Sequence, residues 1–343
     1  MAWLSGWQYR KSVTISGSTG AGKNYQVPLN IGESSGATGY NFHLNGHSAS
    51  FPSDKNKGGD LRFTSSDGST LLDFWVESVS GSSPNRVAKI WVEVSADLGS
   101  NQSIYCYYGN PNATNASNGD NTFLFFDDFE GTSLDTNKWT YTTTAGSNYY
   151  KVENDRFIFH NTHKTAFTSY GILVPKNFSA LTNYAVEYNW QYPTIQEYNV
   201  NLYCKLFSDN NNFYNATWNY QTNPLSNTGL YLSAKIGGTG TQLKYISKTP
   251  TAAVWYHSIF SKNGTSLNYI TDDNELSGTV SQSFNTAPQL DFYLSYKDKE
   301  IWIDYIFVRK YNSTEPSFNT SGSEELPPAG SEELPPAFLL FFN

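Results

Sequence analysis

Short runs in which apolar and polar residues alternate fill residues 3 to about 108, and they constrain the fold more than any other feature. Examples are Tyr25-Gln-Val-Pro-Leu-Asn-Ile31 and Ile90-Trp-Val-Glu-Val94, and clusters of Gly, Ser, Asn and Asp separate the runs. Successive side chains of a strand point to opposite faces of the sheet, so this two-residue period predicts strands with one buried face. No segment keeps a helical period for three turns. The sequence therefore predicts an antiparallel β-sandwich in this region.

The alternating pattern stops once and then begins again. Residues 108–121 are polar and rich in Asn, Gly and Pro, as expected of a connection, and Phe125-Phe-Asp-Asp-Phe-Glu-Gly131 starts a new apolar segment. A chain of 343 residues has room for two or three domains of ordinary size. We expect an all-β protein of two sandwiches in series. The predicted ranges are 1–110 for the first sandwich, 111–121 for a linker, 122–312 for the second sandwich and 313–343 for an extended tail.

Both halves resemble known families. The first carries W-Q-Y-R-K-S-V-T-I from Trp7, G-G-D-L-R-F-T from Gly58 and I-Y-C-Y-Y-G-N-P from Ile104. In this order the three motifs resemble a β-domain that recurs in bacterial and archaeal surface proteins, often just before a concanavalin-like module. The second half opens with F-F-D-D-F-E-G and closes with I-W-I-D-Y-I-F-V from Ile301. It resembles the concanavalin-A-like, or laminin-G-like, jelly roll, whose members most often bind or cleave glycans.

The composition excludes some partners. Charged residues make up 15% of the chain, against an average of about a quarter. The net charge of −8 gives no electrostatic basis for binding nucleic acid or an anionic membrane. No apolar run reaches the ~18 residues of a membrane span. Aromatic residues make up 16%, and the many Asn, Ser, Thr and Gly residues are typical of surface proteins. We expect an extracellular protein, or one on a cell or virion surface.

Candidate glycosylation sites agree with that location. N-x-S/T sites mark surface loops of exported proteins when they are used. The chain has eight such candidates for N-glycosylation: Asn101, Asn112, Asn115, Asn177, Asn215, Asn263, Asn312 and Asn319. Its two cysteines, Cys106 and Cys204, lie in different expected domains. Two buried thiols are favoured over a disulfide between them.

Glycan binding requires aromatic faces beside planar amides or acids. The segment 210–221 has this mixture, and alternation places Tyr214, Trp218 and Tyr220 on one face of its strand. A sandwich core uses aromatic residues at the same spacing, and this alternative is favoured for that face. The candidate glycan-binding residues are Trp190, Tyr192, Tyr198, Tyr214, Trp218 and Tyr220.

Catalysis is not expected. Glycoside hydrolysis needs two carboxyl groups, which concanavalin-like glucanases place on one strand as E-x-D-x-E. The nearest match, Glu187-Tyr-Asn-Trp-Gln191, has amides at the second and third positions. Short D-x-E pairs also occur, such as Asp128 and Glu130, and solvated acids are favoured over a catalytic pair there. For His160 and His163, ordinary histidines at a strand end are favoured over a metal-binding or base motif. Likewise, a structural role is favoured for Asp60 and Arg62, which share one strand face.

Calcium is the favoured metal. The resemblance implies a structural Ca²⁺ between the first and last strands of the second domain, bound by carboxylates and backbone carbonyls, as this cation prefers. The matching residues are Asp127, Asp128, Glu130 and Asp304. The alternative is that Asp128 caps a turn and Asp304 is a hydrogen-bonded acid beside Trp302.

The end of the chain differs in composition. The octapeptide Gly-Ser-Glu-Glu-Leu-Pro-Pro-Ala occurs twice, at 322–329 and 330–337, and is followed by the apolar segment Phe338-Leu-Leu-Phe-Phe342. Its Pro-Pro pairs favour an extended spacer. We expect a non-catalytic glycan-binding or adhesion protein. The alternatives are a structural subunit of a filament or virion that binds copies of itself through this tail, and a glycoside hydrolase or polysaccharide lyase.

Overall fold

The computed structural model describes residues 2–144, 148–161, 169–194, 200–221, 228–295 and 299–328. The chain forms two compact units, one from Met1–Thr122 with the segment that begins at Thr314, the other from Phe123–Ser313. Each is built from two β-sheets, and the strand pairs are antiparallel apart from the parallel pair β2 and β3. The expected all-β class is confirmed. No helix in these ranges is long and apolar enough to cross a membrane.

The first unit pairs a five-stranded sheet with a four-stranded one. The five-stranded sheet has the order β24 (Ser317–Glu325), β1 (Tyr9–Ser16), β8 (Gln102–Tyr108), β4 (Arg62–Thr64), β5 (Leu71–Leu72). The four-stranded sheet has the order β3 (Phe42–His43), β2 (Tyr25–Gly32), β7 (Val87–Val94), β6 (Phe74–Ser80). Alternate residues of these strands, among them Val13, Ile15, Val27 and Leu29, are fully buried in one core. The two-residue period of the sequence thus predicted correctly which residues of these strands face the core.

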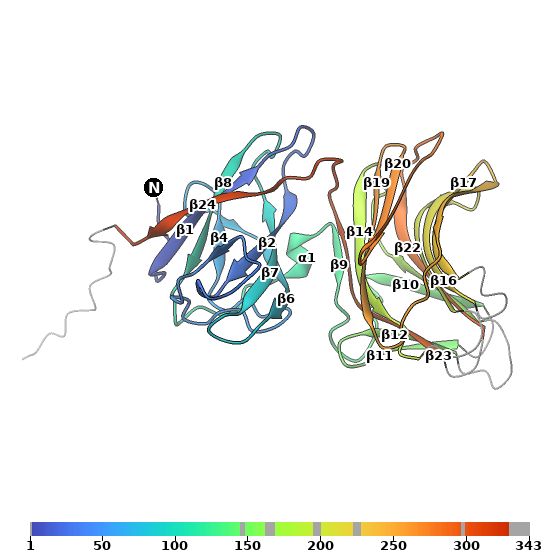
Figure 1. Ribbon diagram of the computed structural model, residues 1–343, viewed down its shortest axis with the longest axis horizontal. Helices are drawn as coiled ribbons and strands as arrows, with labels where there is room; N and C mark the ends of the chain where they lie inside the picture. The colour runs from blue at the N-terminus through green and yellow to red at the C-terminus, as the bar shows by residue number, and fades with distance from the viewer. Residues whose placement is uncertain are drawn as a thin grey trace, which may run out of the picture. The chain divides into compact units, whose positions relative to one another are not determined.

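Two predicted boundaries in this unit are wrong. Residues 317–325 are no free tail: they form β24, which pairs with β1 and lies beside it in Figure 1. Residues 111–121 are no free linker: Asn115 and Ser117 bind the backbone of Gly58 and Val76, and this segment leads into the short helix α1 (Gly119–Thr122). In the sequence, the second unit therefore lies between β8 and β24 of the first unit.

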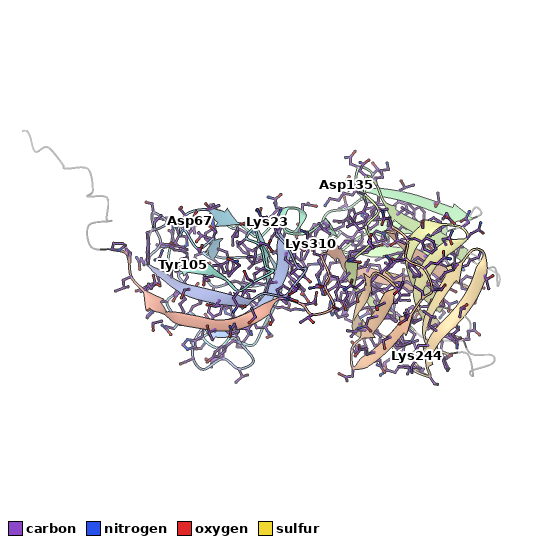
Figure 2. The ribbon with its side chains drawn as sticks, turned by 90° about the horizontal axis from the view of Figure 1, so that it is seen from above. Lys23, Asp67, Tyr105, Asp135, Lys244 and Lys310 are labelled. Carbon is purple, nitrogen blue, oxygen red and sulfur yellow. The ribbon has the colours of Figure 1, made fainter. Side chains whose placement is uncertain are left out.

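A stacked cluster fixes the start of the chain to the five-stranded sheet. The Arg10 guanidinium lies 4.0 Å from the ring centre of Tyr105 and 4.4 Å from that of Trp3. Arg10 also donates hydrogen bonds to the Ala2 carbonyl and the Tyr107 hydroxyl. Figure 2 labels Tyr105 and Asp67 in this unit. Such cation–π contacts stabilise more when the cation is desolvated, as Arg10 is at 5% exposure.

The second unit is a sandwich of seven- and eight-stranded sheets. The seven-stranded sheet has the order β10 (Trp139–Thr144), β13 (Ser169–Pro175), β22 (Ala287–Leu294), β15 (Val200–Asp209), β16 (Asn212–Tyr220), β17 (Gly229–Ile236), β18 (Thr239–Ile246). The eight-stranded sheet has the order β11 (Asn148–Val152), β12 (Phe157–Asn161), β23 (Lys299–Arg309), β14 (Tyr184–Gln191), β19 (Trp255–Asn263), β20 (Ser266–Thr271), β21 (Asn274–Thr279), and β9 (Phe125–Asp127) also pairs with β23. Figure 1 shows β16 and β17 of the first of these sheets as curved ribbons.

The two cysteines are free and fully buried, one in each unit. The expectation of two buried thiols is confirmed. Burial raises the pKa of both thiols, so neither is a thiolate at neutral pH.

Candidate functional site

Four of the predicted glycan-binding residues lie in the core of the second unit. Trp190, Tyr192, Tyr214 and Trp218 are at most 1% exposed and pack between the two sheets. They are core residues, so these four do not bind a glycan, and the core alternative favoured for Tyr214 and Trp218 is confirmed. Tyr220, at the end of β16, is half-buried, and Tyr198 lies outside the described residues.

The opposite face of the seven-stranded sheet carries a different set of side chains. Strand register aligns them in three rows that cross β22, β15, β16 and β17. We call this set the polar grid. Its rows are Gln289, Lys205, Asn215 and Ser233; Asp291, Tyr203, Thr217 and Tyr231; and Tyr293, Asn201 and Asn219. Since the residues between them point into the core, the grid occupies the outer face.

Asp291 is the buried centre of the grid. Its side chain is inaccessible to solvent, and its Oδ2 accepts hydrogen bonds from Lys205 Nζ and the Tyr170 hydroxyl. Gln289 Nε2 donates to Oδ1 over 2.6 Å. A buried carboxylate is tolerated when it is paired and hydrogen-bonded in this way. Burial, followed by the charge of Asp291, raises the pKa of Tyr170, so this phenol stays protonated.

Two asparagines of the grid have an unused hydrogen-bond acceptor. Asn201 donates to the Tyr203 hydroxyl over 3.1 Å, and Asn215 donates to Thr217 Oγ1 over 2.8 Å. Both residues are at least nine-tenths buried, and neither Oδ1 accepts a hydrogen bond from any described residue. A buried polar atom left without a partner costs about 1 to 3 kcal/mol. Neither oxygen is accessible to solvent in this conformation, so a ligand or a water molecule reaches it when a neighbouring side chain moves aside.

Aromatic rings and cations surround these amides. Tyr231 and Tyr245 are half-buried neighbours whose ring centres lie 4.7 Å apart. The ammonium groups of Lys205 and Lys235 lie 5.1 and 5.8 Å from the ring centre of Phe213. Figure 2 labels Lys244, which belongs to the edge strand β18 of the same sheet. The outer face therefore combines flat rings, amides and hydroxyls in one array.

The acids that resembled a catalytic tract lie on the other sheet and are already paired. Glu187 of β14 is 1% exposed, binds Arg309 Nε, and has its Oε2 3.1 Å from His257 Nε2. Glu300 accepts hydrogen bonds from His160, at 2.7 Å, and from Trp302 Nε1, at 2.6 Å. These carboxylates thus have structural partners. His163 lies outside the described residues, as does Asp298, which forms a short D-x-E pair with Glu300.

The acids predicted to bind calcium do not come together as a cluster. Asp127 Oδ1 accepts the Phe129 N–H over 2.8 Å, and Oδ2 accepts Trp139 Nε1 over 2.5 Å. Burial raises the pKa of Asp127. Within the described ranges no group of three or more His, Cys, Asp or Glu residues could hold a metal ion. Asp127, Asp128, Glu130 and Asp304 therefore form no such group, whereas the expected site needs one carboxylate from each strand together with backbone carbonyls. A structural calcium stays a prediction.

One of the predicted glycosylation sites is inaccessible. Asn215 is 9% exposed and its amide nitrogen is bonded to Thr217, so attachment of a glycan there is excluded in the folded state. The other candidates keep some exposure: Asn101, Asn112, Asn115, Asn177 and Asn319 are exposed, and Asn263 and Asn312 are half-buried. Their glycosylation stays a prediction.

Asp60 has a structural role in the first unit. Its carboxylate is solvent-inaccessible and accepts hydrogen bonds from Ser48 Oγ and from the backbone N–H groups of Ala49, Gly109 and Asn110. Arg62 donates instead to two backbone carbonyls. Asp60 therefore ties together three segments of the first unit and is not a ligand-binding acid.

Known proteins resemble parts of this chain. Residues 57–142 match the family model described as "Domain of unknown function (DUF2341)", which covers the later part of the first unit and the start of the second. No curated protein sequence matches the chain.

Several solved structures are similar to about half of the chain. The carbohydrate-binding module CBM66 of Bacillus subtilis is 12% identical, with a TM-score of 0.36 over 50% of this chain and 95% of its own. A β-1,3-glucanase of Mycobacterium marinum is 12% identical, with a TM-score of 0.43 over 54% of this chain and 98% of its own. A pseudo-β-1,3-glucanase of Mycobacterium tuberculosis, also described as an immunostimulatory antigen, is 11% identical, with a TM-score of 0.42 over 55% and 99%. At such low identity the activities of those proteins do not transfer to this chain.

Proposed function

We propose that the second unit binds glycans through the polar grid on the outer face of its seven-stranded sheet, without catalysing a reaction on them. The observation that carries this proposal is the pair of buried amide oxygens, Asn201 Oδ1 and Asn215 Oδ1, that accept no hydrogen bond from a described residue. Once neighbouring side chains move aside, a ligand hydroxyl placed against each oxygen would remove the cost of leaving it without a partner. Sugars carry many such donors.

The rest of the grid suits the same ligand. A sugar ring has an apolar C–H face that packs on aromatic rings and a rim of hydroxyls that binds amides and other hydroxyls. Tyr203 and Tyr231 lie in the central row, between the rows that hold the two asparagines. Asn201 and Asn215 are four residues apart in register, or ~13 Å along the strand. This separation is longer than one sugar ring and favours an oligosaccharide over a monosaccharide.

The grid lacks the groups that hydrolysis requires. A glycoside hydrolase uses two carboxyl groups, one as acid and the other as nucleophile or base. Among the described residues of the grid Asp291 is the one acid, and both of its oxygens are occupied by Lys205, Tyr170 and Gln289. Glu187 belongs to the other sheet and is bound to Arg309. These contacts support binding over turnover.

The composition and the glycan ligand together favour a protein that is secreted or displayed on a cell or virion surface. The rival role, a filament or virion subunit, depends on residues 329–343, which lie outside the described ranges. We therefore keep self-association through the tail as a second hypothesis and propose adhesion to glycans as the main function.

Direct binding tests the proposal. The full chain is screened on an array of neutral and acidic oligosaccharides, and bound ligands are titrated by calorimetry with the wild type, Asn201→Ala and Asn215→Ala. Loss of one hydrogen bond of about 0.5 to 1.5 kcal/mol predicts affinities about 2- to 10-fold weaker for each variant. Asn112→Ala, an exposed asparagine of the first unit, is the matched control. The proposal is overturned if Asn201→Ala and Asn215→Ala both bind with the affinity of the wild type. It is also overturned if the protein releases reducing ends from the oligosaccharide during incubation.

A further inference from the structure

A second group of aromatic residues lies on the opposite side of the same sandwich, on the outer face of the eight-stranded sheet. Tyr149 of β11 is 43% exposed and Trp255 of β19 is 37% exposed. Both are among the few large apolar side chains that the described part of the second unit leaves in solvent. Trp302 of β23 is half-buried between them. We call these three residues the aromatic row.

Strand register places the row across five strands. Trp302 is opposite Ile158 of β12 on one side and Gln191 of β14 on the other, and Gln191 is opposite Trp255. Tyr149 is opposite His160, which is opposite Glu300, two residues from Trp302. The row therefore has an aromatic residue on every second strand, at β11, β23 and β19. Four strand spacings give it a length of ~19 Å.

Neighbouring side chains hold the rings in position. The Arg156 guanidinium lies 4.7 Å from the ring centre of Trp302 and 5.6 Å from that of Trp255, and the two ring centres are 6.4 Å apart. Tyr149 is stacked on the His160 ring, with centres 5.0 Å apart. Ile158 lies on this face and is nevertheless only 3% exposed. The result is a broad layer of rings over the sheet.

The charges of this face balance one another. Lys151 and Glu153 form a salt bridge of 2.8 Å, and His160 Nδ1 lies 2.7 Å from Glu300. Glu300 also accepts the Trp302 indole N–H. Arg156 supplies the remaining positive charge beside these acids. A face with paired charges and exposed rings does not favour a polyanion, and it fits an uncharged ligand with flat apolar faces and polar edges.

We infer that the aromatic row is a second glycan-binding surface, which takes a neutral polysaccharide chain lying flat across the strands. The two exposed rings of Tyr149 and Trp255 supply the stacking area. This surface and the polar grid lie on opposite faces of one sandwich, so a single molecule would bridge two polysaccharide chains. The bridging rests on the proposed function of the grid, whereas binding by the row does not.

Retention on insoluble neutral polysaccharides tests the second surface. The full chain is mixed with cellulose, chitin and insoluble β-1,3-glucan, and the unbound fraction is measured for the wild type, the double variant Tyr149→Ala/Trp255→Ala and the control Leu71→Ala. Leu71 is an exposed apolar residue of the first unit, at 59% exposure. We expect retention on at least one polysaccharide, a loss of 10-fold or more in the double variant, and no change in the control or in 1 M NaCl.

Bridging is measured as turbidity or cross-linking of a soluble neutral polysaccharide. We expect both Tyr149→Ala/Trp255→Ala and Asn201→Ala/Asn215→Ala to abolish it, the second without loss of retention on the insoluble material. If only the aromatic variant reduces binding, the grid proposal fails and the second surface stands alone. Wild-type retention by Tyr149→Ala/Trp255→Ala, with its unfolding temperature unchanged, overturns the inference, as does retention that salt abolishes.

Discussion

The Arg10 guanidinium of β1 and the Glu325 carboxylate of β24 lie 2.7 Å apart, although 315 residues separate them in the chain. The neighbouring residue Glu324 accepts hydrogen bonds from the Tyr108 hydroxyl, from His47 and from the Asn45 amide. Phe318, at the other end of β24, stacks on Phe42 with ring centres 6.1 Å apart. The last described strand is therefore an integral part of the first sandwich.

Removal of β24 is expected to destabilise the first unit selectively. A chain that ends at residue 316 loses the strand that covers the edge of β1, the packing of Phe318 and the partners of Arg10, whereas a chain that ends at residue 328 keeps them. Hydrogen exchange measured by mass spectrometry should show faster exchange in β1 for the shorter chain and unchanged exchange in β15 and β22. Equal protection of β1 in the two truncated chains would contradict this prediction.

The centre of the polar grid gives a stability prediction. Lys205→Met leaves the buried Asp291 carboxylate without its cation, and breaking one partner of a buried pair costs about 3 to 5 kcal/mol. The double variant Lys205→Met/Asp291→Leu removes both charges and should recover most of that loss. Urea denaturation, with Lys244→Met as the control for an exposed lysine, measures the free energy of unfolding. A single variant as stable as the wild type would show that the pair contributes nothing.

Alternation in the sequence identified the strands but not always which face of a strand is buried. In Asn212–Tyr220 aromatic residues occur on both faces, and the spacing of Tyr214 and Trp218 suits a core or a ligand, with the core favoured. The structure buries them because their neighbours Ala216, Leu206 and Leu232 complete an apolar layer. The residues of the polar grid lie on the outer face of the same strand, where Asn215, Thr217 and Asn219 recur at the same two-residue spacing.

β24 and the aromatic row could not be identified from local pattern. The segment Ser317–Glu325 is polar and has no apolar alternation, because it lies at a sheet edge and most of its residues are exposed. Its partner, β1, is about 300 residues earlier in the chain. Likewise, Tyr149, Trp255 and Trp302 are far apart in sequence and come together through strand order alone. Such long-range pairings are decided by tertiary packing.

Acidification is expected to destabilise the first unit through Glu324 of β24. Burial opposes ionisation of Glu324, but hydrogen bonds from Tyr108 and His47 outweigh it and lower the pKa of this carboxyl below its usual value of 4.5. A carboxyl with a lowered pKa contributes stability above its pKa in the unfolded chain and loses that contribution as the pH falls through its pKa in the folded chain. Stability of the first unit should therefore decrease below about pH 4.5. The variant Glu324→Gln should show a smaller decrease between pH 5 and 3 in thermal melts; an identical decrease would assign the effect to other acids.

Lys262 gives the second unit a pH dependence of the same sign in the alkaline range. This lysine is inaccessible to solvent, and its ammonium donates hydrogen bonds to the Thr182 and Phe284 carbonyls, at 2.6 and 2.8 Å. Burial lowers its pKa from 10.5 to about 8. Between these two values the unfolded chain binds more protons than the folded one, so the free energy of unfolding should rise with pH, by about 3 kcal/mol over the whole window.

The contribution of Lys262 to stability is measured between pH 8 and 9.5 in chains that carry Cys204→Ala, because the buried Cys204 thiol has a raised pKa and would lower the stability from about pH 8.5 upward. The buried tyrosines, such as Tyr188, have raised pKa values and lower the stability only above the usual tyrosine value near 10. Urea denaturation should show a rising free energy of unfolding in the wild type and a flatter profile in Lys262→Met. Lys244→Met, at an exposed position, should keep the wild-type slope. If Lys262→Met keeps that slope as well, the ammonium of Lys262 titrates as it does in the unfolded chain, and its two carbonyl partners compensate fully for its burial.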